Sequence, residues 1–352
     1  MSLIDSAKTP REGEELDKAR VEEFLKDAIP ELSGELSVLQ FPSGHSNLTY
    51  LLKVGDTDLV LRRPPFGRKA KSAHDMGREY RILSALHPHF PCPKPLAYTE
   101  DESILGAPFY VMEKIEGIIL RKDLPEGLSL SPPEARDLCG ELVGLHAKLH
   151  NLDHEKIGLA GFGKPEGYIE RQVRGWSRRY RDARTPDAPA AEGVMEWLEK
   201  NMPRGGTRAA VIHGDYKFDN VILDPANPLK IIGVLDWEMA TIGDPLMDLG
   251  SSLAYWVQAD DPEEFQAVRM MPTNLPGMMT RDEIVGLYAE KTGISARPFT
   301  FYLVFGLFRL MGIAQQIYYR YYHGQTKDKR FEQFIFAVHI LEKAAMQEMK
   351  KA

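Results

Sequence analysis

The chain has 352 residues, of which 44 are basic and 51 acidic, and a formal net charge of −7. Its hydrophobic share of 43% and charged share of 27% are typical of soluble globular proteins, and its length suits about two domains. The negative charge argues against a nucleic-acid partner. The two cysteines, Cys92 and Cys139, lack the spacing of a zinc site or a disulfide framework, which suits a reducing compartment.

The apolar segments give no sign of membrane insertion. The N-terminus is polar and acidic, unlike a secretory signal. The longest apolar stretch, residues 301–314, is interrupted by Arg309 and is too short and too charged to span a bilayer. We therefore expect a cytoplasmic protein with no membrane partner.

The first third of the chain mixes helical and strand patterns. A helix is expected from Glu15 to Ala28, and Leu59–Arg63 has the composition of a strand. Apolar residues at helical spacing predict a helix over Met76–Leu86. Phe109–Ile115 is predicted to form another strand. The order of these elements indicates a small mixed α+β region.

The rest of the chain is predicted to be mostly helical. Pro132–His150 carries leucines at helical spacing, and its two prolines suit the first turn of a helix. The short segment Thr185–Ala191 is rich in proline and alanine and is expected to be a loop. An aromatic and aliphatic stripe over residues 301–321 is expected to pack in a core, or in part to line a substrate pocket.

The most informative segment is Val211–Asp248, which contains HGDYKFDN and VLDWE. Val221–Leu223 and Ile231–Leu235 are apolar, and turn-forming residues separate them, which predicts a β-hairpin. Strands of a hairpin lie about 5 Å apart. Asn220, before the first strand, and Asp236, after the second, are therefore expected to lie close together.

These polar residues suit a particular chemistry. Asp215 is of the right type to accept a proton from a hydroxyl group. Asn220 and Asp236 offer oxygen ligands to Mg²⁺, which usually takes only one or two protein ligands and completes its shell with phosphate and water. The segment therefore predicts a magnesium-dependent phosphotransferase that uses a nucleoside triphosphate.

The same motifs resemble the aminoglycoside-phosphotransferase and choline-kinase group, which shares the protein-kinase fold. HGDYKFDN has the His-x-Asp-x4-Asn pattern of its catalytic loop, VLDWE resembles its metal-binding segment, and GDPLMDL matches as well. ERQVRGWSRRY and FRLMGIAQQIYYRYYHGQ resemble the kinase-like domain fused to some acyl-CoA dehydrogenases, and stand-alone bacterial proteins assigned to aminoglycoside phosphotransferases. The resemblance covers about Phe41 to Gln325.

The resemblance implies an α+β protein-kinase-like fold with two lobes. Residues 1–114 would form the N-terminal nucleotide-binding lobe, a small antiparallel sheet plus a helix, with an additional leading helix. Residues 115–352 would form the larger, mostly helical catalytic and substrate-binding lobe. The Ala-Pro-Glu segment of protein kinases is not evident, which argues against a protein substrate.

The resemblance also implies how ATP is bound. The residues expected to cover the phosphates are Ser43, Gly44, His45, Ser46 and Asn47. Arg62 stands where protein kinases carry a phosphate-binding lysine, and Glu79 would hold it through an ion pair, unless that pair is purely structural. Backbone groups of Glu113, Lys114 and Ile115 would contact the adenine edge, which leaves the choice between ATP and GTP open.

In the catalytic loop, the resemblance makes Asp215 the catalytic acid–base group and gives Mg²⁺ to Asn220 and Asp236. His213 belongs to the same catalytic motif, and we expect it to pack and to hydrogen-bond the loop backbone rather than to transfer protons. Asp248 is expected to cap a helix or to hold the catalytic loop. The role of Glu238 is left open: it is either an ordinary loop residue or a catalytic or metal-binding one.

The acceptor is less well defined. Residues 168–181 carry five arginines, Arg171, Arg174, Arg178, Arg179 and Arg181, which form either a solvated helix face or a site for an anionic substrate. The resemblance implies a small-molecule acceptor with a hydroxylated acyl group, such as a hydroxyacyl-CoA or a hydroxy acid, because arginines suit CoA phosphates better than cationic aminoglycosides. Oligomeric state is not indicated.

Three functions are weighed. An active small-molecule kinase is favoured because Asp215, Asn220 and Asp236 are all present. The alternatives are a catalytically silent nucleotide-binding module and a metal-dependent hydrolase, although the sequence lacks the further His and Asp ligands of a two-metal site. A true aminoglycoside kinase is the alternative within the first class.

Overall fold

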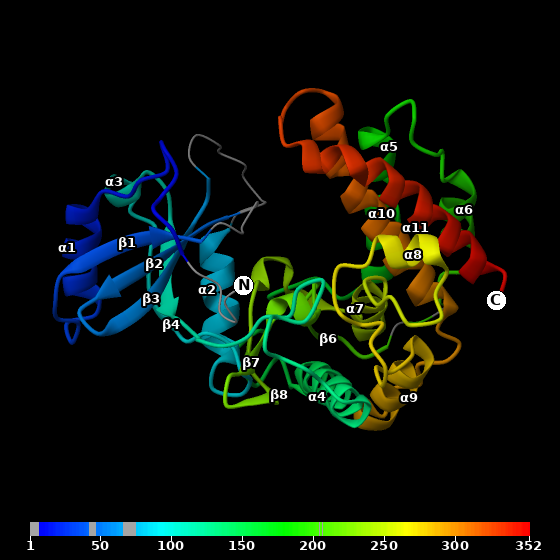
Figure 1. The fold of residues 1–352 in the computed structure, drawn as a ribbon, viewed down its shortest axis with the longest axis horizontal. Coiled ribbons are helices and arrows are strands. Elements are labelled where there is room, and N and C mark those ends of the chain that lie inside the picture. Colours follow the sequence, from blue (N-terminus) through cyan, green and yellow to red (C-terminus); the bar gives the residue numbers. More distant parts are fainter. Residues whose placement is uncertain (1–6, 42–46, 66–74, 204, 206) are drawn as a thin grey trace. The chain divides into compact units, whose positions relative to one another are not determined.

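The computed structural model describes residues 7–41, 47–65, 75–203, 205 and 207–352. Its contacts divide the chain into two compact units (Figure 1). Unit 1 comprises residues 1–119, 157–159 and 220–240. Unit 2 comprises residues 120–156, 160–219 and 241–352.

Unit 1 is built on a five-stranded antiparallel sheet with the strand order β1-β2-β3-β5-β4. Its strands are β1 (Leu36–Gln40), β2 (Leu48–Val54), β3 (Thr57–Arg63), β4 (Pro95–Thr99) and β5 (Phe109–Glu113). Its helices are α1 (Lys18–Ala28), α2 (Met76–Leu86) and the short α3 (Glu102–Leu105). A separate hairpin, β7 (Val221–Asp224) and β8 (Asn227–Val234), and a 3₁₀ turn, η2 (Trp237–Met239), complete the unit.

The core of unit 1 lies between the sheet and helix α1. Val21 and Leu25 of α1 are buried against strand residues such as Leu52, Leu61 and Val111, in one apolar cluster. Strand β3 is central, with β2 on one side and β5 on the other, so its alternate residues are covered on a buried face. This position fixes the direction of Arg62 near the end of β3.

The β7–β8 hairpin packs with unit 1 through backbone hydrogen bonds. Ile118 and Leu223 exchange two such bonds, and the Val234 N–H donates to the Pro91 carbonyl. Residues 220–240 therefore cluster with the N-terminal part of the chain, whereas the predicted lobe boundary at residue 114 assigns them to the C-terminal part. The division into functional lobes stays a prediction.

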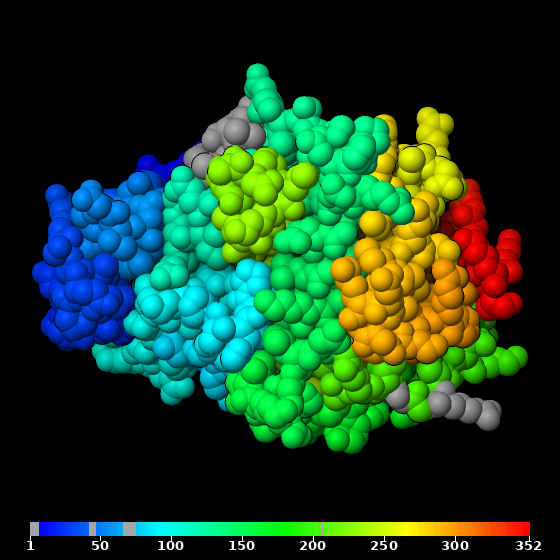
Figure 2. Space-filling model, turned by 90° about the horizontal axis from the view of Figure 1, so that it is seen from below, coloured from blue at the N-terminus to red at the C-terminus, as the bar shows by residue number. Residues whose placement is uncertain are grey.

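Unit 2 is mostly helical. Its helices are α4 (Pro132–Asn151), α5 (Tyr168–Ala183), α6 (Glu192–Lys200), α7 (Pro245–Leu253), α8 (Glu263–Ala267), α9 (Arg281–Thr292), α10 (Thr300–Tyr322) and α11 (Phe334–Met349). Two short strands, β6 (Ala210–Ile212) and β9 (Thr241–Gly243), pair antiparallel, and 3₁₀ turns occur at η1 (Phe218–Asn220) and η3 (Lys329–Gln333). Helices α4 and α9 pack together, and Figure 2 shows the gold side chains around α9 beside the green ones of α4.

Helix α10 is the centre of unit 2, with α5, α7 and α11 packed around it (Figure 1). Its 23 residues are long and apolar enough to cross a membrane, but 72% of that window is buried inside the protein, as in the core helix of a globular protein. The apolar stretch expected from the sequence, residues 301–314, is thus part of a longer helix. Beyond residue 314, Gln315 and Tyr318 continue its buried face.

Helices α7 and α10 approach each other at two glycines. A Cβ atom added to Gly306 would lie 2.0 Å from the Gly250 carbonyl oxygen, and one added to Gly250 would lie 2.2 Å from the Tyr302 carbonyl oxygen. Backbone atoms cannot rotate away as a side chain can. This crossing matters for the site because α7 carries Asp248 and α10 carries Arg309.

Replacing Gly306 by alanine is expected to lower the free energy of unfolding by more than about 3 kcal/mol, because the added methyl group meets backbone. Gly286 of α9 is the matched control, since nothing lies within 4 Å of its added Cβ atom. Gly286→Ala should stabilise the protein by about 0.5–1 kcal/mol through helix propensity alone. Urea unfolding of both variants measures the difference, and equal effects would contradict the close helix crossing.

Most of the helices and strands predicted from the sequence are present. The helix at Met76–Leu86 has the predicted bounds, and the β7–β8 hairpin and the helix from Pro132 are present. The first helix begins at Lys18 rather than Glu15, because the Asp17 side chain caps it by accepting a hydrogen bond from the Arg20 N–H. The α+β class with a small antiparallel sheet is confirmed.

Candidate functional site

A buried ion pair marks the predicted nucleotide side of unit 1. Arg62 of β3 lies 2.7 Å from the Glu79 carboxylate of α2, and their side chains are only 11% and 2% exposed. The pairing predicted from the sequence is therefore present. Burial raises the pKa of Glu79, although Arg62 opposes that shift. A buried arginine held by a carboxylate has a fixed direction, which a phosphate-binding side chain requires.

Arg62 also faces two carboxylates from the VLDWE segment. Its guanidinium lies 3.4 Å from Asp236 and 3.7 Å from Glu238. The Nε of Arg62 is buried and has no hydrogen-bond partner among the described residues. The Nε–H of Arg62 is the type of donor that binds a phosphate oxygen, and a phosphate could also replace Asp236 or Glu238 beside the guanidinium.

Asn47 and Glu238 are linked directly. The Asn47 side chain is buried and donates a hydrogen bond to the Glu238 carboxylate at 2.9 Å. Glu238, whose role the sequence leaves open, thus lies between Asn47 and Arg62. The other residues predicted to cover the phosphates, Ser43, Gly44, His45 and Ser46, lie outside the described residues.

The predicted magnesium ligands meet at the base of the hairpin. The Leu235 N–H donates to the Asn220 carbonyl at 2.8 Å, so Asn220 and the residue after Leu235, Asp236, lie on adjacent chains. Asp236 has a left-handed backbone with φ of 65°, which lets the chain turn out of β8 into η2. The hard oxygen donors of these two side chains fit Mg²⁺.

The predicted adenine-binding segment follows β5. The Glu113 N–H is used within the fold, because it donates to the Lys94 carbonyl at 2.9 Å. The Lys114 ammonium pairs with Asp58 at 2.8 Å. Any adenine contact therefore falls to other backbone groups of Glu113–Ile115, and it stays a prediction.

In unit 2, Asp215 is enclosed by cations. Its carboxylate lies 2.5 Å from the Lys217 ammonium, and their side chains are 20% and 11% exposed. Burial tends to raise the pKa of Asp215, but Lys217 and Arg309 outweigh it and hold that pKa below its usual value. Lys217 lies 4.5 Å from the centre of the Tyr255 ring, which supports the ammonium from the other side. Asp215 is therefore ionised and ready to accept a hydrogen bond from a hydroxyl group.

His213 and Asp248 shape the loop that carries Asp215. The Asp248 carboxylate accepts hydrogen bonds from the backbone N–H groups of His213 at 2.9 Å and Gly214 at 2.7 Å. The His213 Nδ1 accepts from the Asp215 N–H at 3.2 Å. The expected packing role of His213 and loop-holding role of Asp248 are thus both present, and neither side chain needs to react.

Two histidines of α4 complete this network. The Nε2 atoms of His146 and His150 lie 3.0 and 3.1 Å from the Asp248 Oδ2, and the Tyr288 hydroxyl lies 2.6 Å from the His150 Nδ1. His146, His150 and Asp248 offer ligand atoms that all lie within 4.8 Å of one another, a spacing that could hold a metal ion. However, Oδ2 already accepts the His213 N–H, and the distances are those of hydrogen bonds, so we interpret the group as structural.

The network makes stability depend on pH. Burial and the neighbouring His150 lower the pKa of His146 to about 4, although Asp248 opposes the shift. The unfolded chain, with a histidine pKa near 6.5, therefore binds the proton first. The free energy of unfolding should fall by up to about 3 kcal/mol as the pH drops from about 6.5 to about 4.

His146→Gln should flatten this fall, because a glutamine amide can still donate to Asp248 but does not titrate. Urea unfolding between pH 4 and pH 7 measures the slope. His89→Gln, at an exposed histidine, should leave the slope unchanged. If both variants kept the wild-type slope, His146 would not be the titrating group.

The arginines of α5 divide into two sets. Arg171 donates to the backbone carbonyls of Glu166 and Lys164, Arg174 pairs with Glu170, and Arg181 pairs with Glu192. These three are structural contacts. Arg178 and Arg179 have no carboxylate within ion-pair distance among the described residues, and the Arg179 guanidinium lies 4.8 Å from the centre of the Trp176 ring. All five arginines are exposed, so a solvated helix face and a site for an anionic substrate both stay open for Arg178 and Arg179.

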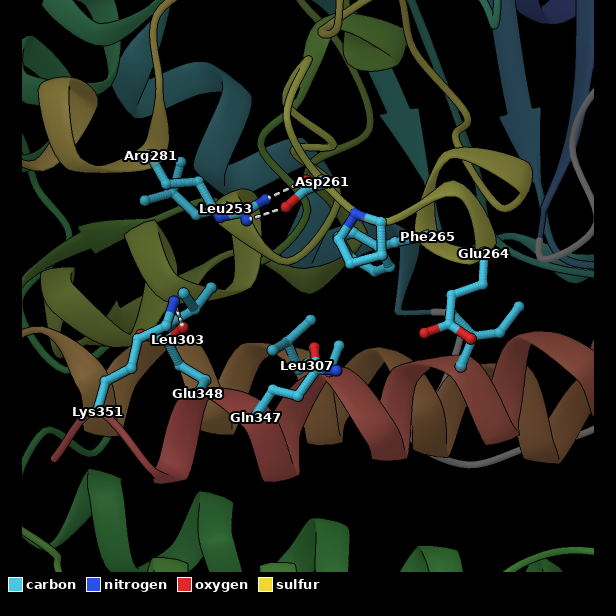
Figure 3. Close-up of a pocket in the computed structure, with 13 residues that line it drawn as sticks. Leu253, Asp261, Glu264, Phe265, Arg281, Leu303, Leu307, Gln347, Glu348 and Lys351 are labelled. Carbon is cyan, nitrogen blue, oxygen red and sulfur yellow. Dashed lines mark hydrogen bonds and ion pairs between the residues drawn. The ribbon is translucent and has the colours of Figure 1, made fainter.

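A pocket of about 140 Å³ lies elsewhere in unit 2 (Figure 3). Its lining includes Leu253, Phe265, Leu303, Leu307 and Ile340, and an ion pair between Arg281 and Asp261 at 2.5 Å closes one side. None of the predicted site residues lines it. Arg281 already donates two hydrogen bonds to the Asp261 carboxylate, so we assign this pocket no catalytic or binding role.

Sequence reasoning missed several residues around Asp215. Lys217 could have been found from the sequence, since it stands two residues after Asp215 in the HGDYKFDN motif. Arg309 had one too, as the only charged residue in the apolar stretch 301–314. His146 and His150 had none, because buried histidines on an apolar helix are ordinarily core residues.

Comparisons with known proteins show the family. A sequence profile of the phosphotransferase enzyme family matches residues 37–277, more than half of the chain. Acyl-CoA dehydrogenase family member 11 of Homo sapiens is 35% identical over 324 residues, which are 91% of this chain and 40% of that protein. The chain thus spans less than half the length of this curated relative.

Solved structures show the fold. A candidate aminoglycoside phosphotransferase from Ralstonia eutropha superposes with a TM-score of 0.81 at 30% identity, over 96% of this chain and 99% of that one. Choline kinase from Cryptosporidium parvum superposes with a TM-score of 0.66 at 11% identity, over 95% and 96%. The predicted kinase-like fold and the resemblance to these phosphotransferases are confirmed.

Proposed function

The chain belongs to the phosphotransferase enzyme family, and from that premise we propose that it is an ATP- and magnesium-dependent kinase of a small-molecule alcohol in the cytoplasm. The observation that carries the proposal is the buried Arg62–Glu79 pair beside Asp236. This arrangement fixes an arginine with an unsatisfied Nε next to the predicted metal ligand. If the Arg62–Glu79 pair were only structural, Arg62 would not need Asp236 and Glu238 beside it as well.

The proposed reaction transfers the γ-phosphoryl group in line to the acceptor hydroxyl. Asp215 orients the hydroxyl and takes its proton, and Lys217 supplies positive charge beside the attacking oxygen. Arg62, held by Glu79, binds the phosphates of ATP, and Asn220 and Asp236 would hold Mg²⁺. When bound, the metal offsets negative charge on the phosphates. Most of the rate enhancement then comes from positioning and electrostatics.

We further propose that the acceptor is a hydroxyacyl-CoA or a hydroxy acid. Arg178 and Arg179 lack carboxylate partners among the described residues, and Asp215 is surrounded by Lys217 and Arg309. Such surroundings repel a polycationic aminoglycoside and attract an anionic alcohol. The human relative is an acyl-CoA dehydrogenase family member by name, which is compatible with an acyl substrate.

The proposal is tested by incubating the protein with magnesium and ATP and a panel of acceptors. The panel contains hydroxyacyl-CoAs, free hydroxy acids, choline-like alcohols and aminoglycosides, and ADP release is measured. Turnover that requires magnesium and one acceptor class supports the kinase. Micromolar binding of an aminoglycoside with no binding of acyl-CoA would overturn the acceptor proposal, and tight ATP binding without turnover on the whole panel would favour a silent nucleotide-binding module.

A further inference from the structure

Arg309 is a buried cation that forms no close ion pair with the described residues, although its charge acts on Asp215 and helps to lower the pKa of that carboxyl. It lies in the middle of α10, and only 6% of the residue is exposed. Its guanidinium donates to the Gly214 carbonyl at 2.7 Å, but no carboxylate among the residues described lies within ion-pair distance of it. A buried charge that is balanced only at longer range is costly. Such a residue in a core helix calls for an explanation.

Further unpaired arginines lie near it. Arg309 is 5.4 Å, and Arg179 4.8 Å, from the centre of the Trp176 ring. Burial, followed by repulsion from Arg178 and Arg309, lowers the pKa of Arg179. Two separate helices, α5 and α10, therefore bring cations together around one aromatic side chain, and no carboxylate of the described residues lies within ion-pair distance of Arg179 or Arg309.

Packing holds the Trp176 ring in place. A Cβ atom added to Gly312 would lie 3.1 Å from the indole, so α10 approaches the ring closely one turn beyond Arg309. Trp176 itself is 6% exposed. Tight packing restricts the positions of the guanidinium groups that contact the indole. The indole that both guanidinium groups contact is thus fixed by packing, although Arg179 itself is exposed.

The location of this cluster relates it to the reacting centre. The carbonyl that Arg309 contacts belongs to Gly214, the residue immediately before Asp215. The side chain of Asp215 is 20% exposed, so an acceptor hydroxyl can reach it. All these residues belong to unit 2. A positive site therefore lies one peptide unit from the proposed base.

We propose that Arg309, together with Arg179 on the Trp176 ring, binds an anionic group of the acceptor alcohol, either a carboxylate or a phosphate. The inference rests on the proposed phosphotransferase function and names the chemical class of its acceptor. Arg309 is a specificity-determining residue in this account, because it selects alcohols that carry an anion and disfavours neutral and cationic alcohols.

The balanced reaction is simple. The acceptor oxygen forms a bond to the γ-phosphorus while the bond from that phosphorus to the bridging oxygen breaks, and ADP leaves with the bonding electron pair. The hydroxyl proton passes to Asp215. Arg309 and Arg179 take no part in bond making, since they only hold the far end of the acceptor.

A purely structural role for Arg309 makes a different prediction. The Gly214 carbonyl needs one hydrogen-bond donor, and a glutamine amide at position 309 can supply it without a charge. Arg309→Gln therefore separates the two roles. Arg174→Gln is the matched control, because it removes the same charge from α5 at an arginine already paired with Glu170 at 2.7 Å.

Three probes with the same hydroxyl group distinguish the anion. They are 4-hydroxypentanoate, which carries a carboxylate, 4-hydroxypentanoyl-CoA, which carries phosphates, and 4-hydroxypentanoyl-pantetheine, which carries neither. KM and kcat are measured with magnesium and ATP, and calorimetry measures the Kd of each probe without turnover. In the wild type, one anionic probe should bind on the order of 10- to 100-fold more tightly than the neutral probe.

Arg309→Gln and Arg179→Gln should remove that preference and leave ATP affinity unchanged, whereas Arg174→Gln should keep it. Equal affinities of all three probes for the wild type would overturn the anion site while leaving the phosphotransferase function intact. An unchanged preference in Arg309→Gln would also overturn it. If no probe is phosphorylated, the calorimetric comparison still decides the inference separately from the proposed function.

Discussion

Replacing Asp215 by asparagine is expected to lower phosphotransfer turnover by about 10²- to 10⁴-fold while ATP still binds. Asparagine has nearly the same shape but cannot accept the hydroxyl proton. Arg62 and Glu79, which we propose bind ATP, belong to unit 1, whereas Asp215 belongs to unit 2. Steady-state kinetics with ATP and the best acceptor of the panel gives kcat, and calorimetry gives the Kd for ATP.

Asp224→Asn is the control for this experiment. It makes the same change of acid to amide at the turn of the β7–β8 hairpin, where the carboxylate only accepts the Ala226 N–H. Its turnover should resemble that of the wild type. Asp215 would lose the role of base if Asp215→Asn turned over as fast as Asp224→Asn.

Replacing Asp236 by alanine is expected to weaken the binding of magnesium-ATP by on the order of 10- to 100-fold or more, the range seen when groups that support a metal site are removed. Magnesium-free ATP should behave differently. Asp236 lies 3.4 Å from Arg62, so its removal leaves that guanidinium with one competing carboxylate fewer. Affinity for ATP in the presence of EDTA should therefore stay the same or increase.

Calorimetric titrations with and without magnesium measure this contrast. Asp224→Ala serves as the control, since it removes a carboxylate from the same hairpin without touching Arg62. A metal-ligand role for Asp236 requires that the magnesium dependence of ATP affinity is lost in Asp236→Ala. Wild-type affinity for magnesium-ATP in that variant would rule out this role.

The sequence could predict those features that depend on local pattern. Met76–Leu86 forms a helix with the expected bounds because its apolar residues follow the helical period and Asp75 caps its start. The proximity of Asn220 to Asp236 follows from a hairpin, whose geometry is nearly independent of the rest of the fold. The Arg62–Glu79 pair could be expected from the family resemblance together with the helix that places Glu79.

Features that depend on tertiary packing could not be predicted in this way. The two glycines, Gly250 and Gly306, are 56 positions apart in the numbering, and nothing local shows that their helices touch. The Asp248 network similarly joins α4, α7 and the catalytic loop. The full extent of α10 could not be predicted because Arg309 interrupts the apolar pattern, whereas the fold buries its guanidinium beside Gly214.

Two buried arginines, one expected from the sequence and one not, have different surroundings. Arg62 and Arg309 are both buried arginines, but Arg62 forms an ion pair with Glu79, whereas Arg309 donates to the Gly214 carbonyl and lies over the Trp176 ring. In our proposal, Arg62 is buried because it binds the phosphates of ATP, and Arg309 because it binds an anion of the acceptor. Each arginine thus corresponds to one end of the proposed reaction, ATP for unit 1 and the alcohol for unit 2.

The most direct test follows the phosphoryl group itself. The protein is incubated with magnesium, ATP labelled in its γ-phosphoryl group, and the acceptor panel, and the products are separated and identified by mass spectrometry. Our account predicts that the label appears in a phosphate ester of an anionic alcohol, only with magnesium present. Label found solely as inorganic phosphate, at a rate independent of every acceptor, would contradict the central claim that this chain is a kinase of a small-molecule alcohol.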